Sequence, residues 1–81
     1  MTDEEAAAIA AEIRGGKRFG SRFQEMEWGI EYAGAGRFRK WSREQWPEWR
    51  EDEEMLGEAA LIEVLKGYSF QNIRRGLWSG R

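Results

Sequence analysis

The side chains in this chain that are most able to do chemistry are carboxylates, because the sequence contains no histidine and no cysteine. Five acids fall close together: Glu48, Glu51, Asp52, Glu53 and Glu54. Carboxylates can hold a hard cation or act as a general acid and base. On the helix expected for this segment, however, acids so close in sequence point around the axis and do not converge. The cluster therefore predicts a solvated negative surface.

The missing residue types exclude whole classes of chemistry. Histidine is the usual general base near neutral pH, and histidine and cysteine supply most ligands of zinc and other soft metals. The glycine-rich residues 34–36 lie between two strand-like segments, whereas a phosphate-binding loop connects a strand to a helix. We therefore expect no enzyme, no catalytic residue, no metal and no cofactor.

Large aromatic residues are the second unusual feature, since they make up 14% of the chain and include five tryptophans. A domain of this size buries only about 60–65% of its unfolded surface, so one small core cannot enclose them all. Half-exposed tryptophans are typical anchors of protein interfaces. Trp46 and Trp49 stand just before the acidic residues 51–54. The predicted partner-binding site consists of Trp46, Trp49, Glu51, Asp52, Glu53 and Glu54.

Basic residues form a second cluster, in which they alternate with aromatic side chains. Aromatic and arginine side chains interleaved on a β-ribbon are typical of single-strand nucleic-acid binding. Nearby glutamates and a sequence pI of about 5.2 favour a protein partner over nucleic acid. The alternative, nucleic-acid-binding site consists of Arg18, Arg22, Arg37, Arg39 and Lys40.

The elements that would carry these residues begin with an N-terminal helix. Thr2 and Glu5 have the spacing of a capping box, and Gly15 and Gly16 are typical of a helix end. Apolar residues between them follow helical spacing. Residues 17–23 are basic and aromatic, and we interpret them as a loop running into a strand, with a full third strand left open.

A β-hairpin is the clearest local prediction. Apolar and polar residues alternate over residues 24–33, residues 34–36 suit a tight turn, and residues 37–41 return as a second strand. A three-residue loop sets apolar against apolar and acid against base. The predicted pairs are Tyr32 with Phe38, Glu31 with Arg39, Glu27 with Arg43, and Gly29 with Trp41. Ile30 then meets Lys40, a mismatch that we expect a bulge to repair.

A long helix is predicted from about Glu44 or Glu48 to Lys66, followed by a short helix that begins near Ser69 and ends at Gly76. An apolar stripe over residues 56–65 supports the long helix, and the capping pattern of Ser42 and Gln45 suits its start. The fold class is therefore α+β: an N-terminal helix, an antiparallel β-hairpin, possibly three strands, packed on one main helix, and a short C-terminal helix. We expect one small domain over residues 1–81.

Two resemblances add to this interpretation. Residues 60–73 resemble the opening of a helix-turn-helix DNA-binding unit, but its recognition helix would have to follow Gly76, where five residues remain. The chain also resembles the small inhibitor proteins of phages and mobile elements, such as anti-CRISPR proteins, in being short, acidic and free of cysteine. That resemblance implies binding to a CRISPR effector and a block of target-DNA binding or nuclease recruitment. Neither resemblance assigns a residue.

The expected function is therefore that of a non-enzymatic, protein-binding inhibitor that occludes a basic nucleic-acid-binding surface. A small nucleic-acid-binding protein and a homo-oligomeric assembly subunit remain as alternatives, and the oligomeric state stays open. No apolar run is long enough to span a membrane, and the acidic N-terminus is unlike a signal peptide. We expect a cytoplasmic protein, in the host cytoplasm if a phage encodes it.

Overall fold

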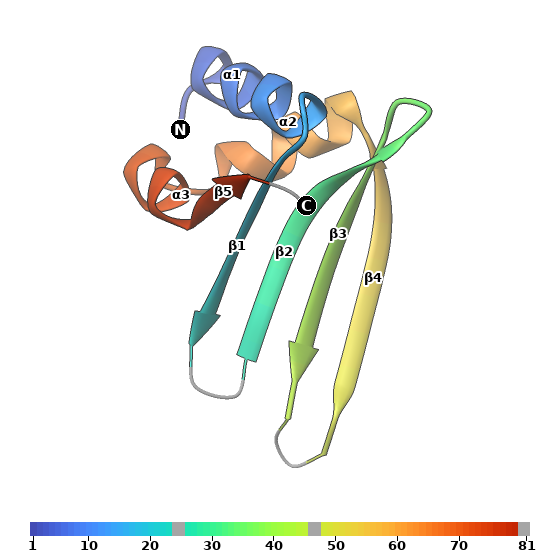
Figure 1. Ribbon diagram of the computed structural model, residues 1–81. Helices are drawn as coiled ribbons and strands as arrows, with labels where there is room; N and C mark the ends of the chain where they lie inside the picture. The colour runs from blue at the N-terminus through green and yellow to red at the C-terminus, as the bar shows by residue number, and fades with distance from the viewer. Residues whose placement is uncertain (24–25, 46–47, 80–81) are drawn as a thin grey trace.

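The computed structural model describes residues 1–23, 26–45 and 48–79, which form three helices and a five-stranded antiparallel sheet (Figure 1). The strands are ordered β4-β3-β2-β1-β5 across the sheet. The elements, in chain order, are α1 (Asp3–Arg14), β1 (Lys17–Phe23), β2 (Met26–Gly34), β3 (Arg37–Glu44), β4 (Arg50–Gly57), α2 (Glu58–Lys66), α3 (Phe70–Gly76) and β5 (Leu77–Ser79).

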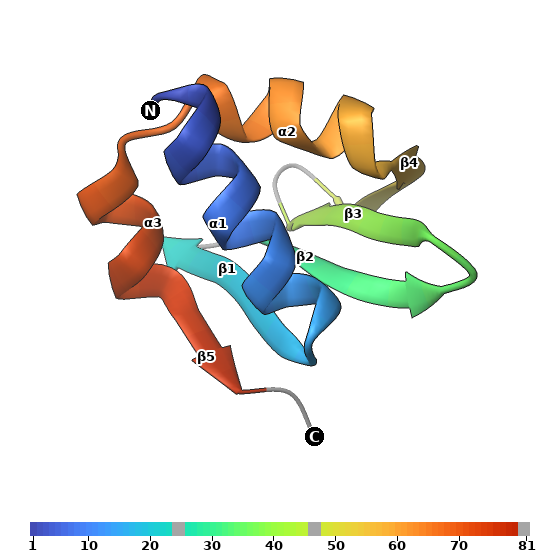
Figure 2. The ribbon, with the colours of Figure 1, turned by 90° about the horizontal axis from the view of Figure 1, so that it is seen from above.

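The helices gather at one end of the sheet, and the long strands run on past them (Figures 1 and 2). The core lies where α1 and α2 meet the sheet and each other. Side chains from α1, from four strands and from α2 and α3 are buried there, because alternate strand residues share one face. The core residues are Ala6, Ile9, Ala10, Ile13, Phe19, Ile30, Phe38, Leu56, Leu61, Leu65 and Ile73. We call this face of the sheet the helix side and the opposite face the open side.

The N-terminal helix begins and ends as the sequence predicts. The Thr2 side chain accepts a hydrogen bond from the Glu5 backbone, and the Glu5 side chain accepts one from the Thr2 backbone, which completes the capping box. The buried residues of α1 follow the expected helical spacing. The short C-terminal helix is also confirmed, since α3 ends at Gly76.

The predicted pairs of the hairpin are confirmed, but the three-residue loop is not, because the register shifts after Tyr32 and Gly34 pairs with Arg37. Tyr32 pairs with Phe38, Glu31 with Arg39, and Gly29 with Trp41. Positive φ angles at residues 34–36 build the turn, and the Gly36 backbone N–H donates to the Tyr32 hydroxyl. The bulge expected at Ile30 and Lys40 is wrong, because between β2 and β3, as far as the structure describes them, the register shifts only between Tyr32 and Gly34. A lysine stem can run along apolar surface while its ammonium reaches water, so this pair needs no bulge.

The long helix predicted from Glu44 or Glu48 to Lys66 is wrong over its first half. Residues 50–57 form β4, and only α2, from Glu58 to Lys66, is helical. Acids of β4 pair with arginines of β3 across the strands, whereas a helix here would have had almost no apolar face to bury. Gly57 is the N-cap of α2.

Two further strands complete the sheet. Residues 17–23 form a full strand that pairs with β2 over five residue pairs. The third strand that the sequence left open is therefore present, and the loop expected before it is wrong. The tail after Gly76 forms β5 beside the start of β1, where the helix-turn-helix resemblance would have required a helix. The hairpin is therefore the centre of a wider sheet that two added strands and β4 extend. No helix of the described residues is long and apolar enough to cross a membrane.

Candidate functional site

The predicted partner-binding residues lie on the outermost strand of the sheet, not on a helix. β4 pairs with β3 on one side, and in the sheet of the described residues it has no neighbour on the other. All its residues except Leu56 are exposed. Trp49 directly precedes it, and 58% of this residue is exposed. Trp46 lies outside the described residues. We call Trp49 together with residues 50–57 the acidic edge.

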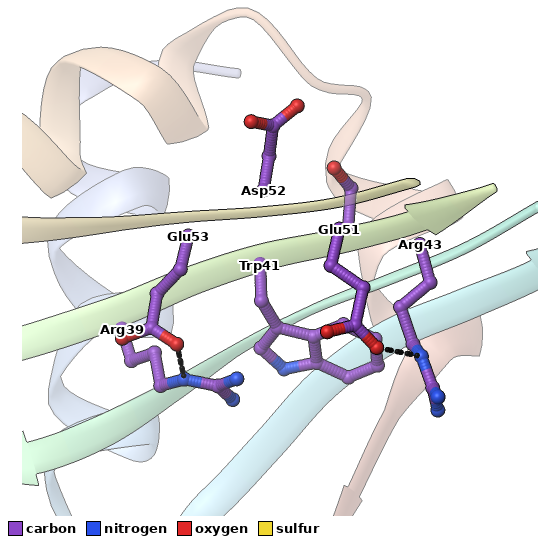
Figure 3. Close-up of a pocket in the computed structure, with 7 residues that line it drawn as sticks. Arg39, Trp41, Arg43, Glu51, Asp52 and Glu53 are labelled. Atoms are coloured by element: carbon purple, nitrogen blue, oxygen red, sulfur yellow. Dashed lines mark hydrogen bonds and ion pairs between the residues drawn. The ribbon is translucent and has the colours of Figure 1, made fainter. Parts of the chain in front are cut away.

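The strand divides the four acids between two faces. Glu51 and Glu53 lie on the open side, while Asp52 and Glu54 lie on the helix side, and Figure 3 shows Asp52 directed away from its neighbours. Glu53 accepts a hydrogen bond from Arg39 at 2.8 Å, and Glu51 accepts one from Arg43 at 3.0 Å. Within the described chain, Asp52 and Glu54 form no ion pair. These two acids are therefore the ones on the edge that no arginine holds, although Lys40 stands opposite Glu54 in the strand register.

Two bridges of the form Glu–Arg–Glu cross three strands on the open side. In the first, Arg39 lies 2.8 Å from both Glu31 of β2 and Glu53 of β4. In the second, Arg43 lies 3.3 Å from Glu27 of β2 and 3.0 Å from Glu51. The sequence predicted the β2 half of each bridge, and the β4 half follows from a strand that the sequence did not reveal.

The two arginines of the bridges also contact aromatic rings, and the bridge at Arg39 changes its pKa. The hydrogen bond to Glu53 raises the pKa of Arg39; burial works against the rise, and Glu31 adds to it. The Arg39 guanidinium lies 5.7 Å from the ring centre of Trp41, and the Arg43 guanidinium lies 5.1 Å from that of Trp49. Trp49 is thus tied to the sheet through a cation–π contact while most of its surface stays in water.

Trp41 occupies the centre of the open side, between the two bridges. It lies over Gly29, as the sequence predicted, and a Cβ added at Gly29 would stand 2.7 Å from the indole carbons. The glycine is therefore required for the close approach of the ring to the β2 backbone.

A shallow hollow of about 500 Å³ opens beside this tryptophan at the acidic edge (Figure 3). Its charged walls are the two arginines of the bridges and three acids of β4, namely Glu51, Asp52 and Glu53. Carboxylates and guanidinium groups alternate along these walls, so the negative charges do not converge on one point. Within residues 1–23, 26–45 and 48–79, no group of three potential ligands could hold a metal ion.

The alternative nucleic-acid site is brought together only in part. Arg18, Arg22, Arg37 and Arg39 share the open side with Trp41, as the strand register requires. Lys40 lies on the helix side, opposite Glu54, so the structure does not bring it together with the four arginines. Arg39 is already held between two glutamates. The other three arginines, Arg18, Arg22 and Arg37, lie around the edge of the open side, and the charges at its centre are paired.

Comparison with known proteins adds no constraint. No family model, no curated protein and no solved structure matches this chain. Its function must therefore be inferred from the geometry.

The sequence also contains a signal for β4. Arg39 and Arg43 alternate with Trp41 on one face of a strand, and they need acids at matching spacing on a neighbouring strand. Glu51 and Glu53 have that spacing. A search for complementary charges on both neighbours of residues 37–44 would have found the strand.

Proposed function

We propose that this protein is a non-enzymatic inhibitor that binds a partner protein through the acidic edge and covers a basic surface of that partner. One observation carries the proposal: the outermost strand of the sheet carries a row of acids, has a backbone edge with which no other described strand pairs, and begins beside an exposed tryptophan. Charge attracts the partner and accelerates association, and the indole supplies apolar contact area.

The division of the acids supports a role in binding. Glu51 and Glu53 are engaged by β3 and hold the edge strand in place, so they contribute mainly to the shape of the surface. Asp52 and Glu54 remain available to a partner. The unpaired backbone groups of β4 are also able to accept a strand of the partner, because a sheet edge is a template for strand addition.

A second copy of this chain does not suit the edge as a partner. If two β4 strands paired side by side, they would bring their acids together, and like charges on facing strands destabilise a sheet. Charged residues on an edge strand are a common protection against such pairing. The same charges that exclude self-pairing favour a partner with lysine or arginine on its surface.

The narrowest form of the proposal takes the partner to be a CRISPR effector complex, as the resemblance to anti-CRISPR proteins implies. Such complexes hold their guide–target duplex in a positively charged channel. An acidic edge placed over that channel would exclude DNA by occupying its place. No chemistry by the inhibitor is needed.

The test is a double reversal of the two available acids, Asp52→Lys with Glu54→Lys. Wild-type protein and variant are used for affinity capture from a nuclease-treated cell lysate, and a captured protein is then purified and its DNA binding measured with and without the inhibitor. We expect the variant to lose both capture and inhibition, because each change replaces an attraction with a repulsion.

A matched control reverses Glu4 and Glu63, which are exposed acids on the helices. It changes the net charge by the same amount and should leave binding intact. Circular dichroism establishes that both variants are folded. If wild type, variant and control capture the same proteins, the acidic edge is not the binding surface.

The second candidate function is nucleic-acid binding, and the observation that favours it is the position of Trp41 among arginines on the open side. It is tested by titration with labelled single-stranded DNA at about 50 mM salt, followed by about 200 mM salt. Binding that weakens steeply with salt and requires Trp41 would replace the proposal above.

A further inference from the structure

The opposite edge of the sheet, formed by β5 and by the part of β1 beyond it, is not acidic like β4. A binding site at this edge does not depend on the function proposed above. β5 pairs with β1 only from Lys17 to Phe19, so residues 20–23 of β1 have a neighbour on one side alone among the described residues. Figure 1 shows β5 beside only the first part of β1. This free stretch offers unpaired backbone groups to an added strand.

Two adjoining hollows lie between this free stretch and α3. Their volumes are about 400 and 520 Å³. We call them together the α3 groove, defined by the residues that line both: Phe19, Ser21, Trp28, Asn72 and Arg75. Hollows of this size can accept a large side chain.

The floor of the groove is aromatic and continuous. The rings of Phe19 and Trp28 lie 5.3 Å apart, and Trp28 stacks on Tyr68 at 5.4 Å with an angle of 5° between the rings. Tyr68 lines one of the two hollows. The Tyr68 hydroxyl is protonated at neutral pH and able to donate a hydrogen bond, and burial raises its pKa further.

The rim of the groove is cationic. Arg22 and Arg75 are exposed, and in the part of the chain that the structure describes neither belongs to an ion pair. Asn72 adds an amide donor from α3. One acid, Glu27, also lines the hollow of about 400 Å³, and its carboxylate is paired with Arg43. The groove therefore presents donors and positive charge around an apolar floor.

We propose that the α3 groove binds a short extended segment of another protein that carries carboxylates around one large apolar side chain. The backbone of the segment adds to residues 20–23 of β1, the apolar side chain lies on the half-buried Trp28 and Tyr68, and the carboxylates meet Arg22 and Arg75. Charge complementarity excludes a basic segment from the same place.

The acidic strand of a second copy has a suitable charge but not a suitable shape. β4 continues through Gly57 directly into α2, and a copy of this helix would need the space that β5 and α3 occupy beside β1. The free stretch is only four residues long. A flexible segment of a different protein meets both constraints.

The test uses a fluorescein-labelled peptide of sequence Gly-Asp-Phe-Asp-Glu-Gly, blocked at both ends, titrated with the full chain while fluorescence anisotropy is recorded. We expect saturable binding below about 1 mM and slower hydrogen exchange of the amides of residues 20–22. Arg75→Glu should weaken binding about tenfold, because it replaces an attraction with a repulsion. Arg50→Glu makes the same change of charge on β4 and should leave the affinity within about twofold.

A peptide N-methylated at alternate residues should fail to bind, because it cannot pair with a strand. The proposal is overturned if the wild-type chain shows no saturable binding, if both variants weaken binding equally, or if the N-methylated peptide binds as well as the parent. Sedimentation velocity of the chain without peptide tests whether a second copy of the protein occupies the groove. A dimer that Arg75→Glu abolishes would assign the groove to a second copy and also overturn the proposal.

Discussion

Replacing Gly29 with alanine tests whether the open side is organised around Trp41. The added Cβ would lie 2.7 Å from two indole carbons and 2.8 Å from the indole nitrogen. To restore an ordinary contact near 3.4 Å, the ring must move by about 0.7 Å, away from the β2 backbone. Such overpacking typically costs about 1–3 kcal/mol in the free energy of unfolding. For a domain of this size, that corresponds to a melting temperature lower by about 4–8 °C per kcal/mol.

The backbone of Gly29 gives no other reason for the glycine, since its φ lies outside the left-handed region. When Trp41 is first replaced with alanine, the clash is absent. Gly29→Ala should then stabilise the protein by about 0.4–1 kcal/mol, because it restricts the unfolded chain. The effect of one substitution therefore changes sign with the residue opposite.

The assay is a double-mutant cycle by urea unfolding of the wild type, both single variants and the double variant. Far-UV circular dichroism is the appropriate signal, because removal of Trp41 alters the fluorescence. We expect a coupling energy of about 2 kcal/mol between the two positions. If Gly29→Ala destabilises the protein equally with and without Trp41, the close approach is not the reason for the glycine.

Two further predictions concern ion pairs. Arg39→Gln removes one bridge and should lower the free energy of unfolding by about 0.5–1.5 kcal/mol at low salt. The loss should be smaller at about 1 M salt, because salt screens the charges. Arg37→Gln on the same face is the control, and an equal loss of stability in that variant would contradict the role of the bridge. Burial raises the pKa of Glu12, but hydrogen bonds and charges from Arg74 and Lys17 outweigh it, so the net pKa lies below 4.5. A lowered pKa contributes stability that is present above the unfolded-state value near 4.5 and is lost as the pH falls through the folded-state pKa. Urea midpoints should therefore show Glu12→Gln less stable than wild type near neutral pH, with the difference vanishing in acid; a constant difference would refute this assignment.

Local pattern was sufficient for the first helix and for the hairpin. The capping box of Thr2 and Glu5 involves residues within one turn, and the register of β2 and β3 follows from a short turn and an alternation of residues that lie close in sequence. A slip of one residue would have moved Tyr32 out of contact with Phe38. Few alternative structures fit these local patterns, so the first helix and the hairpin could be predicted without contacts to residues distant in sequence.

The acidic segment shows why local pattern failed elsewhere. Residues 50–57 contain good helix formers, and on their own they fit the start of a helix. Their strand structure depends on Arg39 and Arg43, which β3 presents at the matching spacing. The same holds for β5, which pairs with the start of β1 across most of the length of the chain.

What the sequence determined by itself is the inventory of possible interactions: no imidazole, no thiol, many indoles, and charges in opposite clusters. The tertiary structure decided how they are used. It turned one acidic run into an edge strand with two unequal faces, set Trp41 over Gly29, and left the free part of β1 beside a cationic groove. Composition and short-range periodicity are local properties, whereas the choice between helix and strand here rests on contacts between segments that are distant in sequence.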